Sequence, residues 1–389
     1  METDFRKTGF RFEGDEVEFY CEPDGFSDLA EGESVFVAGT FNAWLTTADS
    51  SWRLAKKISK NKVYFSLKKP ASHVMIPGNT GFPEFKFFAI SNTSYHLLTE
   101  NFDSSSTTFE TNKLIFQTQE DFDIIQEIIN RPDHKKSLSD FDLTCPACRS
   151  DISNVRVVPG TNCLLRGYNP FKRSKNEFDT ETTRIALAQK AYEIYNVNCD
   201  ITLNGFEGAS TACGEEMPEI IKKINAMGNR LCINIDYNLV YFHPDAVDYS
   251  VALRKIALFI IEREGPYFIH CRLGSDRTGV TCAIFAALCG ASWKDIVHDY
   301  ERTANMGVGE YRNRKLLQYS LGKMLRINPA DAKDLAHAMQ SYFIKENILK
   351  MEEISRLIER LQEPLKTDET NYFDFNEKHI CAKKNANIK

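Results

Sequence analysis

Short runs of alternating apolar and polar residues dominate the first 118 residues of the chain. Turns rich in Gly, Asn, Ser and Pro separate these runs, at the spacing that is typical of an all-β sandwich. The runs of strand length lie at residues 17–21, 35–38, 62–67, 84–88 and 114–116. About 115 residues suffice for one sandwich. We therefore predict an all-β domain over residues 1–118.

A helix and a polar linker follow in the pattern. Residues 120–129 have helical spacing, and Arg131-Pro132 ends the run because the residue before a proline avoids the helical region. Residues 134–140 are polar and carry no apolar period. We assign residues 119–149 to this helix and linker.

Beyond the linker, apolar runs of strand length alternate with helical segments. The strand-like runs lie at residues 163–167, 199–203, 231–235 and 267–269, and the helical segments at 180–195, 217–227 and 249–264. This alternation predicts an α/β domain with a mainly parallel sheet flanked by helices, over residues 150–363. The last segment, 364–389, is rich in Lys and Asn and is predicted to be a polar tail.

The apolar run 267–269 leads into a loop whose composition suits anion binding. The loop, residues 270–279, reads His-Cys-Arg-Leu-Gly-Ser-Asp-Arg-Thr-Gly and precedes a helical segment rich in small residues. Backbone N–H groups in such a turn, with a helix N-terminus behind them, form a concave nest for a tetrahedral dianion. Ligands of open α/β sheets bind at the C-terminal ends of strands, where this loop falls.

Two residues of the loop turn an anion nest into a reaction site. A Cys271 thiolate, stabilised by the same N–H groups, is a nucleophile for in-line attack on a phosphate ester. Arg277 presents a planar, permanently charged fork to two phosphoryl oxygens, which lysine could not reproduce. Thr278 is placed to donate to the departing sulfur, and His270 is an orienting neighbour. The predicted phosphate cradle comprises Arg272, Leu273, Gly274, Ser275, Asp276 and Arg277.

The motif Cys271-x5-Arg277-Thr278 resembles the signature of the cysteine-dependent protein tyrosine and dual-specificity phosphatase superfamily. With its flanking His, Gly and Thr-Gly it is closest to the bacterial tyrosine and lipid phosphatase branch. Ser275 stands where that branch usually has Lys, which removes a cation and weakens the expectation of a phosphoinositide preference. The resemblance implies hydrolysis of phosphomonoesters without a cofactor or metal.

The general acid stays open between two carboxylates. Expulsion of an alkoxide or phenoxide needs a proton donor above the nest. In the bacterial branch the Asp directly before the signature Arg is assigned this role, which favours Asp276. Pro244-Asp245 resembles the Pro-Asp of the mobile loop that supplies the acid elsewhere in the superfamily. Asp236 and Asp248 are further upstream candidates.

A second resemblance covers the first domain only. Residues 35–44, Val-Phe-Val-Ala-Gly-Thr-Phe-Asn-Ala-Trp, resemble the strand-turn opening of starch- and glycogen-binding modules like those of AMP-activated kinase β subunits. This implies an immunoglobulin-like sandwich in which an aromatic face stacks on a sugar while polar side chains bond hydroxyls. The matching positions are Trp44 and Lys86 and, less closely, Tyr95 and Asn112. The alternative is a sandwich that has lost its ligand.

Composition narrows the function further. The chain has 389 residues, of which 42% are hydrophobic, enough for two domains with sizeable cores. Its 48 basic and 54 acidic residues give a net charge of −6 and no basic field for nucleic acid. No apolar run reaches ~18 residues, so we expect no membrane span. The charged N-terminus shows no secretory signal.

The cysteines indicate a reducing compartment. The chain has 11 cysteines, an odd number without a regular spacing, which predicts a cytoplasmic location. Cys145 and Cys148 form a C-x-x-C pair, but no second pair follows at zinc-ribbon spacing. A plain linker or turn is therefore favoured over a metal site there.

Together these patterns predict a two-domain phosphatase. We expect phosphotyrosine or phosphoserine protein, or a phosphorylated glucan, as substrate, because the domain pairing is similar to that of the glucan phosphatases. A phosphoinositide or inositol phosphate is the alternative. A different class is a catalytically weak scaffold that binds phosphate or glycan without turnover. Glycogen- or starch-like glucan is the partner expected for the first domain, and nucleic acid is not expected.

Overall fold

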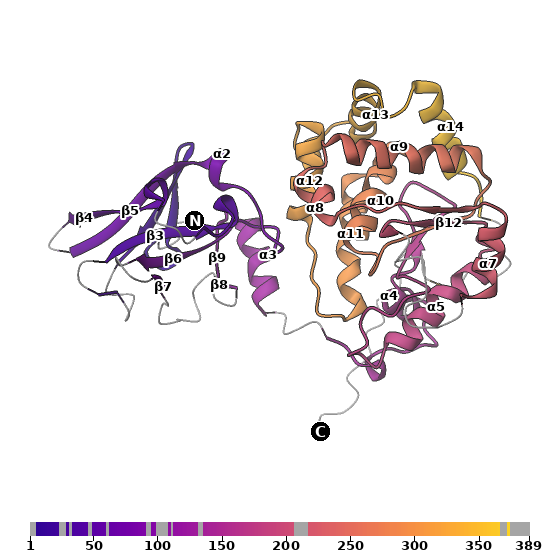
Figure 1. Cartoon of the computed structure of the whole chain (residues 1–389), viewed down its shortest axis with the longest axis horizontal. Helices are drawn as coiled ribbons and strands as arrows, with labels where there is room; N and C mark the ends of the chain where they lie inside the picture. The colour runs from indigo at the N-terminus through magenta and orange to yellow at the C-terminus, as the bar shows by residue number, and fades with distance from the viewer. Residues whose placement is uncertain are drawn as a thin grey trace. The chain divides into compact units, whose positions relative to one another are not determined.

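The chain is seen here in a computed structural model, which divides it into two compact units, Met1–Pro132 and Asp133–Lys389 (Figure 1). The structure describes residues 5–22, 29–30, 33–45, 49–59, 62–90, 95–98, 108–109, 112–130, 135–205, 217–365 and 372–373.

The first unit is built from two antiparallel sheets. One has the order β1-β2-β5-β4, with strands Phe10–Glu13, Glu16–Cys21, Lys62–Pro70 and Ala55–Ser59. The other has the order β3-β6-β9-β8, with β7 also paired to β6; its strands are Ser34–Gly39, Glu84–Ile90, Asn112–Leu114, Thr108–Phe109 and Tyr95–Leu97. The helices are α1, Phe5–Thr8, α2, Ala71–Val74, and α3, Gln119–Asn130.

Phenylalanine rings join the two sheets of this unit. The rings of Phe10 and Phe19, from β1 and β2, lie 6.2 and 5.2 Å from the ring of Phe85 on β6. Phe85 and Phe87 are both buried. Because side chains alternate across a strand, the residues between them face away from this core. The β-sheets predicted for the first domain are confirmed, and the immunoglobulin-like topology stays a prediction.

A five-stranded sheet runs through the second unit in the order β10-β11-β14-β12-β13. The strands are Arg156–Val157, Leu164–Gly167, Tyr267–His270, Cys199–Thr202 and Arg230–Cys232. β10 and β11 form the predicted antiparallel hairpin. The pairs β11–β14, β14–β12 and β12–β13 are parallel. β14 therefore lies in the middle of the sheet.

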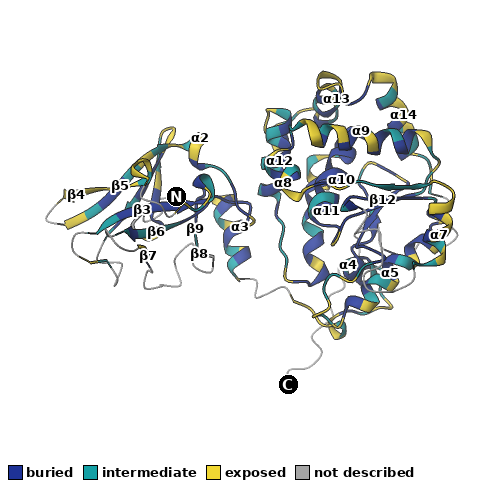
Figure 2. Cartoon of the chain, viewed as in Figure 1, coloured by how far each residue is buried: buried dark blue, intermediate teal, exposed yellow. Residues whose placement is uncertain are grey.

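Helices cover both faces of this sheet. They are α4, Pro146–Ser153; α5, Glu181–Ile194; α7, Glu219–Ala226; α8, Tyr237–Phe242; α9, Val247–Glu262; α10, Asp276–Leu288; α11, Trp293–Arg302; α12, Arg314–Leu325; α13, Leu335–Lys345; and α14, Met351–Leu361. Phe268 of β14 packs with α4, α5 and α7, whereas Tyr267 and Ile269 pack with α9, α10 and α13. Every residue of α10 from Thr278 to Leu288 is buried (Figure 2). This central helix fixes the loop that precedes it.

The structure differs from the expected organisation at two boundaries. α4 begins at Pro146, inside the predicted linker, because proline is favoured in the first turn of a helix and Cys145 takes the N-cap position. Cys148 is buried in the core on that side of the sheet. In the segment predicted as a polar tail, Phe373 is 1% exposed and its ring lies 6.0 Å from that of Tyr195.

Candidate active site

The loop between β14 and α10 forms the centre of the candidate site. β14 ends at His270, and α10 begins at Asp276 with Ser275 as its N-cap residue. Gly167 of β11 and Thr202 of β12 both lie opposite His270 in the register of the sheet. The segments after β11 and β12 therefore flank residues 271–275 at the C-terminal edge of the sheet.

Gly274 is the one position of this loop where a side chain would not fit. Its φ is +77°, in the left-handed region that glycine adopts most readily. A Cβ atom there would lie 2.3 Å from the carbonyl oxygen of Gly167 and 2.8 Å from Nδ2 of Asn154. Asn154 Nδ2 also donates to the carbonyl of Leu273 at 3.1 Å. The turn is thus held against the end of β11.

Cys271 is the first residue of the loop, and Arg277 follows the loop in α10. Cys271 is 2% exposed and follows β14 directly. Arg277, in the first turn of α10, donates from Nη1 to the carbonyl of Ile235 at 3.4 Å. Among the described residues, the buried Nε of Arg277 has no partner, and neither do Ser275 Oγ and Thr278 Oγ1. A buried polar group without a partner costs ~1–3 kcal/mol, so these groups are suited to an oxyanion.

A buried network holds His270 beside Cys271. Nδ1 of His270 lies 3.1 Å from the carbonyl oxygen of Cys271. Nε2 lies 3.2 Å from Oδ1 of Asp200 and 3.1 Å from Oγ1 of Thr202. Nδ1 therefore faces an oxygen of the loop and Nε2 faces two oxygens on the neighbouring strand β12, which fixes the imidazole plane.

Asp200 is the anchor of that network. It is fully buried on β12 and accepts from Tyr192 at 2.6 Å and from Nε of Arg230 at 3.1 Å. Burial opposes ionisation of Asp200, but the neighbouring His270 and Arg230 outweigh burial and lower the pKa of this carboxyl. The carboxylate form is therefore the one that supports His270.

Two arginines and one aspartate form a second buried cluster behind the loop. Asp299 of α11 accepts from Nε of Arg156 at 2.5 Å and is ion-paired with Arg166. Arg166 also donates from Nη2 to the carbonyl of Gly274 at 2.5 Å. Burial opposes ionisation of Asp299, yet the two guanidinium groups lower the pKa of its carboxyl. Two cations against one anion leave a positive charge next to the catalytic loop.

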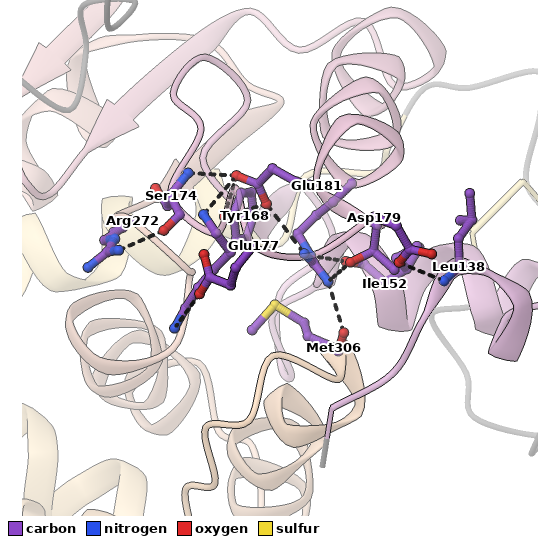
Figure 3. Close-up of polar contacts among 12 residues, drawn as sticks. Leu138, Ile152, Tyr168, Ser174, Glu177, Asp179, Glu181, Arg272 and Met306 are labelled. Carbon is purple, nitrogen blue, oxygen red and sulfur yellow. Dashed lines mark hydrogen bonds and ion pairs between the residues drawn. The ribbon is translucent and has the colours of Figure 1, made fainter. Parts of the chain in front are cut away.

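A third buried cluster holds the segment that follows β11 (Figure 3). Oε1 of Glu181, at the start of α5, accepts from the backbone N–H groups of Ser174 and Lys175 at 2.6 and 3.1 Å. The hydroxyl of Tyr168 donates to the same oxygen at 2.9 Å. Arg272 of the catalytic loop then donates to the carbonyl of Ser174 at 2.7 Å. Glu181 thus positions the segment that Arg272 contacts.

Arg184 completes this third cluster. The side chain is fully buried and pairs with Glu181 at 3.4 Å. It donates to the carbonyls of Ile152 and Met306 at 2.8 and 2.9 Å (Figure 3). Burial is the main cause of a lowered pKa for Arg184, even with the carboxylate of Glu181 beside it. One side chain thus joins α4, α5 and the segment after α11.

The structure places the candidate acids in different surroundings. Asp276 accepts from Nε of Arg312 at 2.6 Å and from the hydroxyl of Tyr241 at 2.8 Å. Burial alone would raise the pKa of Asp276, but Arg312 and Tyr241 lower it on balance. Asp245 lies beyond the C-terminal end of α8, where Arg326 donates to it at 2.6 Å. Asp276 is therefore held in its ionised form, whereas Asp245 is paired with Arg326 at the C-terminal end of α12.

Among the upstream candidate acids, Asp236 is the nearest in sequence to Ile235, the residue that contacts Arg277. It directly follows Ile235, whose carbonyl accepts from Arg277. Its exposed carboxylate caps α8 by accepting from the backbone N–H of Asn238 at 2.8 Å. Asp248, in the first turn of α9, is further from Ile235 along the chain. Asp236 is thus at the rim of the loop.

Three of the four residues matched to glucan-binding modules lie in the sheet of the first unit that contains β6. Lys86 is on β6 and alternates with the buried Phe85 and Phe87, so it faces outward. Asn112 begins β9, next to β6, and donates to Glu84 at 2.8 Å.

Tyr95 and Trp44 are the other two matched residues. Tyr95 on β7 pairs with Ile90 of β6 and is 59% exposed. Trp44 follows β3 with a φ of +58° and is partly exposed.

Several residues of the site were not found by the sequence reasoning. Asp200 and Arg156 are charged residues inside apolar strand-like runs. A charge in such a run was the only sequence signal that pointed to them. Asp299 lies on an ordinary amphipathic helix, and Arg312 in an irregular segment, so neither position stands out in the pattern. Their roles depend on contacts between elements far apart in the sequence.

The described residues also bear on membrane crossing and metal binding. None of the helices there combines the length and apolarity that a bilayer crossing requires. In the same part of the chain, no cluster of three or more His, Cys, Asp or Glu side chains is arranged to hold a metal ion.

Comparison with known proteins gives one family match. Residues 176–363 match the model of a family described as the tyrosine phosphatase family, and this range includes the whole catalytic loop. No curated protein matches the chain. A solved structure, the core catalytic domain of the PP-IP phosphatase SIW14 from S. cerevisiae in complex with citrate, is similar at 16% identity over 50% of this chain and 94% of that chain. Its TM-score of 0.23 is too low to bear on fold or function.

The family match bears directly on the loop between β14 and α10. It supports a cysteine-based, tyrosine phosphatase-like domain in the second unit, with the hydrolase activity of that superfamily. The match names no substrate.

Proposed function

We propose that the chain hydrolyses phosphomonoesters through a phosphocysteine intermediate formed on Cys271. The observation that carries this proposal is the set of buried, unpartnered donors in the segment that follows Cys271: Ser275 Oγ, Arg277 Nε and Thr278 Oγ1. They lie at the N-terminus of the buried helix α10, which stabilises negative charge. A dianionic phosphoryl group would satisfy all three donors.

The reaction proceeds in two displacements. The Cys271 thiolate attacks phosphorus as the bond to the ester oxygen breaks, and an acid delivers a proton to that oxygen. Water then attacks the phosphocysteine, which releases phosphate and restores the thiolate. Arg277 and the loop N–H groups stabilise the equatorial oxygens in both transition states. Thr278 donates to the sulfur as it leaves in the second step.

For the acid we favour Asp236 over Asp276 and Asp245. The Arg312 ion pair favours the ionised form of Asp276, which has no proton to give. Asp245 is bound to Arg326 beyond the end of α8. Asp236 lies next to the contact between Ile235 and Arg277, and its carboxylate is exposed. Asp276 then serves to orient Arg312 and Tyr241 beside the loop.

The acid is tested by the dependence of the rate on the leaving group. Replacing Asp236 by Asn should lower kcat about 100-fold for phenyl phosphate, whose leaving group needs a proton, in line with the usual contribution of acid catalysis. The rate for p-nitrophenyl phosphate should fall far less, because p-nitrophenolate leaves unprotonated. The same leaving-group effect in Asp276→Asn or Asp245→Asn, and not in Asp236→Asn, would move the acid to that residue.

The activity itself is tested with p-nitrophenyl phosphate in EDTA. Wild type should release phosphate at a rate that EDTA does not change, and Cys271→Ser should release none. Wild type without turnover, with its thiols confirmed reduced, would favour the scaffold that only binds phosphate. A reducing cytoplasm is the compartment that suits this thiol.

We further propose that the substrate is a phosphorylated protein or glucan and that the first unit binds glucan. Support comes from Trp44, because a non-glycine residue at φ +58° is strained and such strain gathers at functional sites. Lys86 projects from β6 opposite Ala38 of β3, and Tyr95 is exposed on β7 of the same sheet. Trp44→Ala and Lys86→Ala should abolish co-sedimentation with amylose, and the exposed Lys56→Ala should not. Equal sedimentation of all variants would refute this role.

A further inference from the structure

A cavity on the far side of Asp299 from the catalytic loop is not used by the proposed reaction. Its volume is about 850 Å³. None of the residues 271–278 lines it. Its walls come from β10, the turn after β10, α11 and the chain that follows α14: Arg156, Val157, Val158, Pro159, Gly160, Thr161, Asn162, Lys294, Asp295, His298, Asp299, Arg302, Pro364 and Leu365. This volume is in the range of sites for small molecules.

Basic groups outnumber acidic groups in its walls. The cavity is lined by Arg156, Lys294, His298 and Arg302, against Asp295 and Asp299. The charge of Asp299 is already offset by two arginines, Arg156 and Arg166. Among the described residues, no ion pair or hydrogen bond engages the side chain of Lys294. Arg302 is paired with Asp151 at 2.9 Å, so the positive charge that remains comes from Lys294 and from the two arginines that share Asp299.

The N-terminus of α11 adds to that charge. Lys294 and Asp295 lie in the first turn of this ten-residue helix, and both line the cavity. The N-terminal end of a helix carries a partial positive charge. Asp295 lies in the same turn, where its carboxylate accepts from the Ser292 hydroxyl at 2.6 Å and opposes part of this positive charge.

Arg156 lies in the cavity wall close to two other arginines. It is 4% exposed in the cavity wall. Burial lowers its pKa to about 10, and repulsion by Arg166 and Arg302 contributes, although Asp299 acts in the opposite direction. An anion in the cavity would reduce this repulsion. The electrostatics of the wall therefore favour an anionic occupant.

Apolar residues form the rest of the wall. Val157, Val158 and Pro159 line one side, and Pro364 and Leu365 line another. An inorganic ion would leave most of the volume and this surface unused. We propose that the cavity is a binding site for a small organic anion with at least two negative charges, held by Lys294 and His298 and packed against these apolar residues.

The cavity shares one wall with the support of the catalytic loop. Arg156 and Asp299 line the cavity, and Asp299 pairs with Arg166, which donates to the carbonyl of Gly274. A ligand in the cavity is thus two contacts from the loop without touching it. This binding site goes beyond the proposed hydrolysis and does not depend on turnover.

Calorimetric titration of the full chain with naphthalene-1,5-disulfonate tests the proposal, because this aromatic dianion has no phosphoryl group to be hydrolysed. We expect one site per chain, and saturating tungstate, which occupies a phosphate-binding loop, should leave it open. The double variant Lys294→Ala, His298→Ala should weaken binding at least about tenfold, as the loss of charged contacts predicts. The control is Lys255→Ala, an exposed lysine on α9, which should bind as wild type does.

Three results would overturn the proposal. These are no binding of the disulfonate, complete displacement by tungstate, or equal affinity of the double variant and wild type. Displacement by tungstate would place the anion in the catalytic loop instead. Loss of turnover on p-nitrophenyl phosphate, by contrast, would refute only the proposed hydrolysis, so the two failures are distinguishable.

Discussion

At the scale of single residues, the candidate site depends on a few buried polar contacts around Gly274. Arg166 binds its carbonyl, Asn154 binds the carbonyl before it, and Gly167 lies against its Cα. These contacts leave no room for a side chain and determine the curvature of the loop. The loop geometry is therefore a property of its neighbours as much as of its own sequence.

Replacing Gly274 by Ala should abolish phosphatase activity. The added Cβ would lie 2.3 Å from a backbone oxygen, at a φ of +77° that alanine rarely adopts. We expect turnover of p-nitrophenyl phosphate to fall at least about 100-fold, because displaced loop donors no longer match the transition state. Gly290→Ala is the matched control, since Gly290 has a φ of +85° but nothing within 4 Å of its Cβ position. Equal activity of the two variants would contradict this account of the loop.

Replacing Asp299 by Asn should destabilise the protein by about 3 kcal/mol, because it leaves Arg156 and Arg166 buried without a counter-charge. Chemical denaturation measures the loss. Asp295→Asn is the control on the same helix, because asparagine keeps the acceptor at an exposed cap, and it should change stability by less than about 0.5 kcal/mol. A similar small change in Asp299→Asn would show that the cluster is unimportant.

The sequence was informative about residues whose chemistry is local. Cys271, Arg277 and Thr278 stand at fixed offsets in one loop, so their shared site could be predicted. Asp299 and Arg312 reach the loop from elements far away in the chain, and a single sequence contains no signal of those contacts. The pattern left the acid open between Asp276 and Asp245, and the ion pair of Asp276 with Arg312 is seen only in the fold.

At the scale of elements, α5 controls the segment beside the loop through one carboxylate. Glu181 binds the backbone of Ser174 and Lys175, and the carbonyl of Ser174 accepts from Arg272. The short segment around Ser174 thus contacts both α5 and the loop between β14 and α10. We infer that Glu181 of α5 affects substrate binding by positioning the segment that Arg272 contacts, without touching the substrate itself.

Glu181→Gln should raise KM for p-nitrophenyl phosphate several-fold and change kcat less, because an amide is a weaker acceptor for the two backbone N–H groups. The control, Glu177→Gln, alters an exposed carboxylate of the same segment and should leave both constants unchanged. A drop in kcat alone for Glu181→Gln would argue against a positioning role.

Elements with a clear apolar period were predicted, and short ones were not. The hairpin of β10 and β11 and the helix α9 follow from apolar runs of ordinary length. α8 has only six residues, too few to show an apolar period. α4 was not predicted because Pro146, at its start, also suits a linker. Both become helices because their buried sides pack against longer elements.

At the scale of the whole molecule, the second unit extends beyond the helices that close its sheet. Tyr372 and Phe373 return to the face covered by α4 and α5, where the backbone carbonyl of Tyr372 accepts from Arg149 at 2.8 Å. The composition of residues 364–389 predicted a polar tail, because two aromatic residues among many polar ones have little effect on the average polarity of the segment. The tail therefore contributes to the core.

Replacing Phe373 by Ala should destabilise the second unit by about 3 kcal/mol, the usual cost of removing a buried phenylalanine ring. Tyr372→Phe is the control, because it keeps the neighbouring ring and should be near neutral. Thermal unfolding of the full chain reports both. Equal melting temperatures for Phe373→Ala and wild type would show that the aromatic pair is not part of the folded core.

The two units also differ in how far their function could be inferred. The second unit has a family match and, in the segment that follows Cys271, buried donors without a partner among the described residues. For the first unit the sheets are established, and its glucan role rests on Trp44 and its neighbours alone. Whether the chain acts on protein or glucan therefore depends on the substrate tests, whereas its chemistry depends on one thiol.

Rapid acid quench during turnover of p-nitrophenyl phosphate, followed by mass analysis of the peptides, tests that chemistry most directly. The account predicts the mass of one phosphoryl group on the peptide that contains Cys271, present in wild type and absent in Cys271→Ser. Turnover with the phosphoryl group on another residue, or without any covalent intermediate, would contradict it.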